Sequence, residues 1–379
     1  MKKLKFMILS VILAVSTASY AVAGEVIKVG AILAVTGGAS FLGAPEAKTL
    51  QMLVDEVNAK GGINGNKVEL IIKDSQGQPE KAISFAKQLI EEEKVFAIIG
   101  PSRSGETLKI KGTCEEAKII LLSCAAAEQI INPVARYVFK TPQTDSNAAR
   151  MIFMQMNKMG ISKVGVVVGN TGFGKAGKEQ IEKLAPEYGI EILISEVYDA
   201  KGADLTAVAT KVKAQNVQAV INWSITPAQS IFAKNMRQIG MNVPLFQSHG
   251  FGNIKYVEAA GEAAEGIIFP AGRLLVAEEL PEDHPQKAVL VKYKRDYEAK
   301  YGEEVSTFGG HAYDAFMILV KAIEQAGPDQ EKVLDAIVNM KGFVGTGGVF
   351  NFSPDDHGGL DINAFEMLTV KGGKFVLLK

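Results

Sequence analysis

The segment from Lys163 to Gln247 contains four short apolar runs: KVGVVV at 163–168, IEILISEV at 190–197, AVIN at 219–222 and VPLFQ at 243–247. Helical patterns separate them, one starting near Gly174 and two others at 203–215 and 226–239. Strands that alternate with amphipathic helices are typical of a parallel sheet with crossover helices. The segment therefore predicts one complete α/β unit.

The same alternation comes earlier in the chain. Strands are predicted at 26–33, 67–73, 95–99 and 119–123, with helices at 45–59 and 79–93. The helix at 79–93 has apolar residues spaced by three and four, which marks one buried stripe. Two similar α/β units in tandem are therefore expected, with a helix near 145–159 opening the second.

Residues 272–285, rich in Pro, Gly and acidic residues, interrupt the alternation. Helices at 285–300 and 307–326 follow, and then strands near 348–352, 364–370 and 374–378. If these helices return to the first unit and the last strands join the second, the chain crosses between the units three times. The predicted fold is α/β, with two Rossmann-like lobes joined by a three-crossing hinge that permits closure. Lobe 1 would contain 24–143 and 273–353, and lobe 2 would contain 144–272 and 354–379.

The first residues have the layout of a secretory signal peptide. Lys2, Lys3 and Lys5 precede an apolar stretch at 6–15, and Ala21-Val22-Ala23 forms a small-residue cleavage site. The apolar stretch is shorter than the ~20 residues that a membrane-spanning helix needs. We expect cleavage after residue 23 and a soluble, exported, periplasmic protein.

Composition excludes several classes of protein. Loss of residues 1–23 removes three lysines and no acid, so the formal net charge falls from −1 to about −4. This charge gives no basic surface for nucleic acid, and a monomer is expected. Cys114 and Cys124 form no disulfide framework. They could pair after export, but the predicted elements place them too far apart, which favours buried free thiols.

Several motifs together resemble the branched-chain (Leu/Ile/Val-type) amino acid binding proteins of ABC transporters, which have the type I periplasmic binding fold. The similarity covers residues 25–379. Its motifs are Val29-Gly30-Ala31, Thr36-Gly37, Asn58 to Gly65 with Asp74, Ile99 to Ser104, Phe173-Gly174, Ala263 to Gly266, and Ala312 to Ala315.

The resemblance implies a ligand carboxylate held on lobe 1. Ser104 matches the family's carboxylate-binding serine, at the start of a helix that follows a strand, where backbone N–H groups favour anions. The backbone of Ala125, Ala126 and Ala127 would assist, although Ala127 stands where the family often has a threonine. A second interpretation remains open for Ser104, namely that it only caps its helix.

Other positions match the walls of the family's pocket. Leu42, Phe173 and Tyr313 are implied as wall residues, and Ile225 lies in a wall and hinge loop. Trp223, the only tryptophan, either stacks on the ligand or seals its lobe.

His249 departs from the family pattern. The amino acid binders tend to have an acidic residue here, which pairs with the ligand's ammonium. An imidazole donates to a carboxylate or carbonyl, and is a poor partner for ammonium when charged. Either His249 is structural, or the ligand is a non-amino carboxylate, aliphatic or aromatic.

Two other motifs were considered as sites. Gly169 to Ala176 approaches a phosphate loop, but Ala176 stands where that loop needs Ser or Thr. Gly172 to Gly177 fits a dinucleotide motif, with Glu196 or Asp199 as the acidic residue, but export argues against nucleotide binding at either motif. These glycines are instead expected to let the backbone approach the ligand. His284, His311 and His357 have no metal-ligand spacing. No cofactor, metal or catalytic set is predicted, and we expect no enzyme.

The predicted function is the solute-binding component of an ABC importer, with a small carboxylate-bearing ligand between the lobes and an inner-membrane permease as partner. The ligand would be a branched-chain or other hydrophobic amino acid, or a non-amino acid. The alternative is a sensing domain that reports to a receptor or regulator, since the fold serves both roles.

Overall fold

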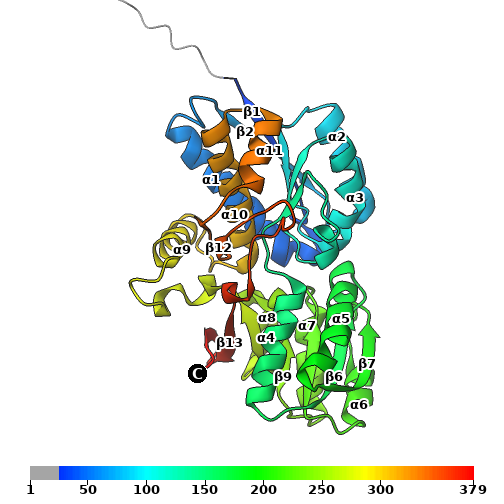
Figure 1. Ribbon diagram of the computed structural model, residues 1–379. Coiled ribbons are helices and arrows are strands. Elements are labelled where there is room, and N and C mark those ends of the chain that lie inside the picture. Colours follow the sequence, from blue (N-terminus) through cyan, green and yellow to red (C-terminus); the bar gives the residue numbers. More distant parts are fainter. Residues whose placement is uncertain (1–24) are drawn as a thin grey trace, which may run out of the picture.

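The computed structural model describes residues 25–379, so the predicted signal peptide at 1–23 lies outside the described residues. Within that range the strands form a five-stranded sheet, a seven-stranded sheet and a two-stranded ribbon. Figure 1 shows the two large sheets in separate lobes, one above the other.

Lobe 1 is built on the sheet with strand order β2-β1-β3-β4-β5, whose pairs are all parallel. The bounds are β1 Ile27–Leu33, β2 Val68–Asp74, β3 Ala97–Ile99, β4 Ile120–Ser123 and β5 Val138–Lys140. Its early helices are α1 Ser40–Ala59, α2 Pro79–Glu91 and α3 Ser104–Glu116. Helices cover both faces, which explains why strands such as β3 are apolar throughout.

Lobe 2 is built on the sheet with strand order β14-β13-β10-β9-β8-β6-β7. Its parallel strands are β6 Lys163–Gly169, β7 Glu191–Tyr198, β8 Ala219–Trp223, β9 Leu245–Gln247 and β10 Ile268–Ala271. The antiparallel strands β13 Glu366–Lys371 and β14 Lys374–Leu377 close the edge. Its helices are α4 Asp145–Lys158, α5 Gly172–Leu184, α6 Thr206–Lys213, α7 Ala228–Gln238 and α8 Ile254–Ala260.

The chain connects the lobes in three places, as the sequence predicts. It leaves lobe 1 after β5 and returns after β10 to form α9 Lys287–Tyr301, α10 Thr307–Ala326 and α11 Gln330–Val338. The long helix α10 packs against α1 in lobe 1, as Figure 1 shows in orange and blue. After the ribbon of β11 Phe343–Val344 and β12 Val349–Phe350, the chain crosses again to β13. The exact lobe limits given above stay a prediction.

Hydrogen bonds connect the first crossing segment, the β11–β12 turn and α10. Gln143 Nε2 in the first segment donates to the Gly347 carbonyl at 2.8 Å. The Asp314 carboxylate of α10 accepts from the backbone N–H groups of Thr346 and Gly347 at 2.6 and 2.7 Å. The first segment and the β11–β12 turn, which precedes the third segment, therefore lie together beside α10, where a small dihedral change can move one lobe against the other.

The differences from the predicted elements are local. Helix α1 begins at Ser40 instead of near Pro45. Strands β5, β10 and β11 and helices α8 and α11 were not predicted; the three strands have two to four residues, too few for a clear periodic pattern. Cys114 and Cys124 are buried free thiols, as expected.

Candidate functional site

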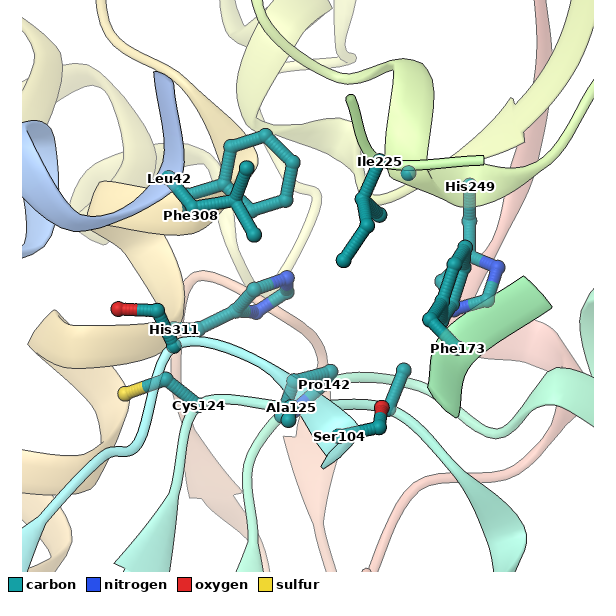
Figure 2. Close-up of a pocket in the computed structure, with 13 residues that line it drawn as sticks. Leu42, Ser104, Cys124, Ala125, Pro142, Phe173, Ile225, His249, Phe308 and His311 are labelled. Carbon is teal, nitrogen blue, oxygen red and sulfur yellow. The ribbon is translucent and has the colours of Figure 1, made fainter. Parts of the chain in front are cut away.

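A small cavity lies between the lobes at the carboxyl ends of the parallel strands. Figure 2 shows side chains from both lobes around this space. Its lining residues are Leu42, Ser102, Ser104, Cys124, Ala125, Ala126, Pro142, Phe173, Ile225, His249, Gly250, Phe308 and His311.

Seven of the ten predicted site residues line the cavity: Leu42, Ser104, Ala125, Ala126, Phe173, Ile225 and His249. The family resemblance implies these positions, and most of them also follow strand ends, which parallel topology gathers at one edge of each sheet. That they bind a ligand stays a prediction.

Ser104 is the first residue of α3, and its side chain is buried beside the cavity. Its Oγ accepts from the Ala127 backbone N–H at 3.2 Å. Within residues 25–379 its hydroxyl proton has no acceptor, so it is available to a ligand. Because Arg103, not Ser104, occupies the N-cap position and makes no side-chain cap bond, the capping interpretation of Ser104 is wrong.

Helices α3 and α5 meet end to end across the cavity rim. Gly105 of α3 and Gly172 of α5 lie so close that a Cβ on Gly172 would be 2.8 Å from the Gly105 Cα and amide nitrogen. Both helices thus direct the positive ends of their dipoles at one region, which favours a negative charge there. The backbone of the glycine-rich segment from Gly169 to Gly177 is expected to approach the ligand. At Gly172, however, this segment lies in close contact with Gly105 of lobe 1.

His249 follows β9 and enters the cavity wall from lobe 2. It lies among Phe173, Trp223 and Phe365, with ring centroids at 5.4, 5.5 and 5.8 Å. Neither ring nitrogen makes a hydrogen bond within the described residues, although Nε2 is 3.4 Å from Asp145 Oδ1. Burial, and then the charge of Lys140, hold the pKa of His249 well below its usual value. The ring is therefore neutral near pH 7.

His311 faces the cavity from lobe 1 and was not predicted as a site residue. It lies on α10 one turn after Phe308, so both side chains share one face of the helix. Burial, with a smaller contribution from Lys140, lowers the pKa of His311 to about 3, and its Nδ1 has no hydrogen-bond partner in the described part of the chain. The spacing of three residues between Phe308 and His311 places both on one helix face, and this pattern could have indicated His311 as a wall residue.

Two buried ionisable groups lie behind the cavity wall. Lys140, fully buried, donates from Nζ to the carbonyls of Pro142 and Gln143 at 2.9 and 3.2 Å. Asp145 opens α4, and both of its oxygens lack a hydrogen-bond partner among residues 25–379. Burial raises the pKa of the Asp145 carboxyl, while the charge of Lys140 acts in the opposite direction. Neither residue lines the cavity.

Three predicted site residues do not line the cavity. Ala127 is fully buried in the lobe 1 core, and its N–H is used by Ser104. Trp223 is one layer behind the wall: a Cβ on Gly177 of α5 would be 2.1 Å from its Nε1, so the indole fills the space under that helix. This position favours the interpretation that Trp223 seals its lobe, which stays a prediction.

Tyr313 was predicted as a wall residue and lies elsewhere. Two residues after His311, it is about 200° around α10 and so faces away from the cavity. Its ring packs on Tyr293 of α9, with centroids 5.0 Å apart. The direction in which Tyr313 points around the axis of α10 contradicts the prediction of a wall residue. The Ala312 to Ala315 motif alone does not reveal this direction.

The described residues 25–379 hold no group of three or more His, Cys, Asp or Glu side chains arranged for a metal ion. Within the same range, no helix has both the length and the apolar character needed to cross a membrane.

Two α/β lobes, three connecting segments and an inter-lobe cavity define a type I periplasmic binding protein. In agreement, residues 26–374 match the family model described as periplasmic binding protein. The chain belongs to this family.

Named relatives and solved structures agree with the fold. The chain is 25% identical over 326 residues to the leucine-, isoleucine-, valine-, threonine-, and alanine-binding protein of Pseudomonas aeruginosa, covering 84% of each chain. An extracellular ligand-binding receptor from Rhodopseudomonas palustris HaA2 is 28% identical with a TM-score of 0.87, over 93% of this chain and 99% of that one.

A third relative is the branched-chain amino acid transporter substrate binding protein LivJ of Streptococcus pneumoniae, solved in complex with isoleucine. It is 27% identical with a TM-score of 0.83, over 93% of this chain and 98% of that one. These relatives are binding proteins, in agreement with the prediction that this chain is not an enzyme.

Proposed function

We propose that this chain is the periplasmic solute-binding component of an ABC importer, and that its lobes close over a small carboxylate-bearing ligand. The observation that carries the proposal is the cavity lined from both lobes, with the free hydroxyl proton of Ser104 at the start of α3. The relatives named as amino acid binding and transporter substrate binding proteins support the same role.

The carboxylate would be held on lobe 1. The Ser104 hydroxyl donates to it, and the positive ends of α3 and α5 stabilise its charge. Leu42, Phe173, Ile225 and Phe308 supply an apolar wall for the rest of the ligand. Closure excludes water, which strengthens these few polar contacts.

A thermal-shift and calorimetric screen tests the ligand class. Leucine, isoleucine and valine are compared with aliphatic and aromatic carboxylates that lack an amino group, and each hit with its uncharged amide. A ligand at a hundredfold excess over its Kd stabilises the folded protein by about 2.7 kcal/mol. The proposal predicts that carboxylates are stabilising and that their amides are much weaker.

The variant Ser104→Ala separates a bound carboxylate from general stabilisation. Loss of a hydrogen bond to a charged group should weaken carboxylate binding by about 1.5 to 3 kcal/mol. The matched control is Ser162→Ala, at an exposed serine outside the cavity. Because Ser104→Ala also removes the acceptor of the Ala127 N–H, the melting temperature without ligand is measured in parallel. Unchanged carboxylate affinity would exclude Ser104 from the site.

Transport is tested with the cognate permease and ATPase in proteoliposomes. The liganded protein should stimulate ATP hydrolysis, and the ligand-free protein should do so much less. A ligand that binds without stimulating the permease would favour the sensing role instead.

A further inference from the structure

The polar groups in the cavity wall are unusual for a site that would hold an amino acid. Among its lining residues none is Asp, Glu, Lys or Arg, and the polar side chains are two serines, one thiol and two imidazoles. An ammonium group needs an acceptor, best a carboxylate, when it is removed from water. The wall offers no carboxylate.

The two imidazoles come from opposite lobes and lack partners. His249 is 7% exposed and His311 is 6% exposed, and three of their four ring nitrogens are buried without a hydrogen bond within residues 25–379. A neutral imidazole has one donor and one acceptor nitrogen. Buried polar atoms without partners are costly, so a ligand that supplies both kinds of partner recovers that cost.

The charges around the cavity disfavour a positively charged group on the ligand. The positive ends of α3 and α5 face the rim, and Lys140 lies behind the wall near both imidazoles. The nearest carboxylate on the lobe 2 side, Asp145, is behind His249 and is not part of the lining. An ammonium would therefore meet imidazole and not carboxylate.

We propose that the ligand is a small acid with an apolar body, a carboxylate, and a hydroxyl or carbonyl group in place of an ammonium. His249 and His311 are the specificity-determining residues that bind this uncharged group, one from each lobe. The inference rests on the proposed function, since it assumes that a carboxylate is bound between the lobes.

Matched ligands test the proposal directly on the full mature chain. Calorimetry compares leucine with 2-hydroxy-4-methylpentanoate and 2-oxo-4-methylpentanoate, and phenylalanine with phenyllactate, because each pair differs mainly in the amino group. The hydroxy or oxo acid should bind at least tenfold more tightly than its amino acid. Equal or tighter binding of the amino acid would overturn the inference and leave the proposed function intact. Binding of no carboxylate in the wider screen would overturn the proposed function itself.

Variants connect that preference to the two histidines. His249→Gln and His311→Gln should each reduce the preference for 2-hydroxy-4-methylpentanoate over unsubstituted 4-methylpentanoate by fivefold or more. His284→Gln is the control, because His284 lies outside the cavity and should leave the ratio unchanged. A ratio unchanged in both cavity variants would refute the assignment.

A reversal of specificity gives a second, independent readout. His249→Asp places a carboxylate in the wall and should raise the affinity for leucine relative to its hydroxy acid by tenfold or more. Circular dichroism and the melting curve establish whether this variant folds, and the two glutamine variants decide the question if it does not. A folded His249→Asp protein with the original preference would contradict the proposal.

Discussion

The contact between Gly105 and Gly172 makes lobe closure sensitive to a single methyl group. A Cβ on Gly172 would be 2.8 Å from two backbone atoms of Gly105, whereas carbon atoms pack favourably at about 3.5 to 4.0 Å. Backbone atoms cannot rotate away as a side chain can. Gly172→Ala therefore requires the two helices to separate by roughly 1 Å at the cavity rim.

The cost applies only when the lobes are closed. Overpacking a tight contact typically costs ~1 to 3 kcal/mol, and each 1.4 kcal/mol is tenfold in affinity, so the Kd should rise by roughly 5- to 150-fold. Gly172 has no positive φ, so alanine is compatible with its backbone. The melting temperature of the ligand-free protein should stay near that of the wild type.

Gly105→Ala is a matched control at the same contact. A Cβ on Gly105 would be 3.8 Å from the nearest atom of Gly172, which is ordinary van der Waals contact. Its Kd should stay within about twofold of the wild type. Calorimetry with the best ligand of the screen gives the two Kd values, and small-angle scattering with ligand shows whether each variant closes. Wild-type affinity in Gly172→Ala, or equal losses in both variants, would refute this account of closure.

Three further predictions concern single residues near the cavity. Cys124 lines the cavity, whereas Cys114 is buried in the lobe 1 core. A ligand at a hundredfold excess over its Kd should therefore slow the alkylation of Cys124 by ~100-fold and leave the alkylation rate of Cys114 unchanged, as measured by mass spectrometry. A folded-state pKa of about 3 for His311, against ~6.5 when unfolded, means that stability is lost as pH falls below 6.5, by about 2 kcal/mol at pH 5. In His311→Gln, urea unfolding at pH 7.5 and pH 5 should show that this loss of stability at the lower pH is absent. If the stability difference between the two pH values is the same as in the wild type, the prediction is contradicted. Trp223 touches Phe173 and His249, so its emission should change on ligand binding in the wild type and much less in His249→Gln.

The sequence alone determined the architecture. Alternating strands and helices specify parallel sheets, because each crossover helix must cover a face of the sheet beside it. Topology then places the residues after each strand at one edge, and the family resemblance assigns Ser104, Phe173, Ile225 and His249 among them to the pocket. Such positions depend on chain order, which the sequence contains.

Only the tertiary structure decided which way side chains face and how deep they lie. His311 and Tyr313 are two residues apart on α10, yet one lines the cavity and the other packs on Tyr293, since a turn of 100° per residue separates their faces. Trp223 lies behind the wall because Gly177 leaves room for it there. The approach of Asp145 to His249 also depends on packing between segments far apart in the chain. Periodicity and motif carry no information on such distances, which arise only when segments far apart in the chain pack together.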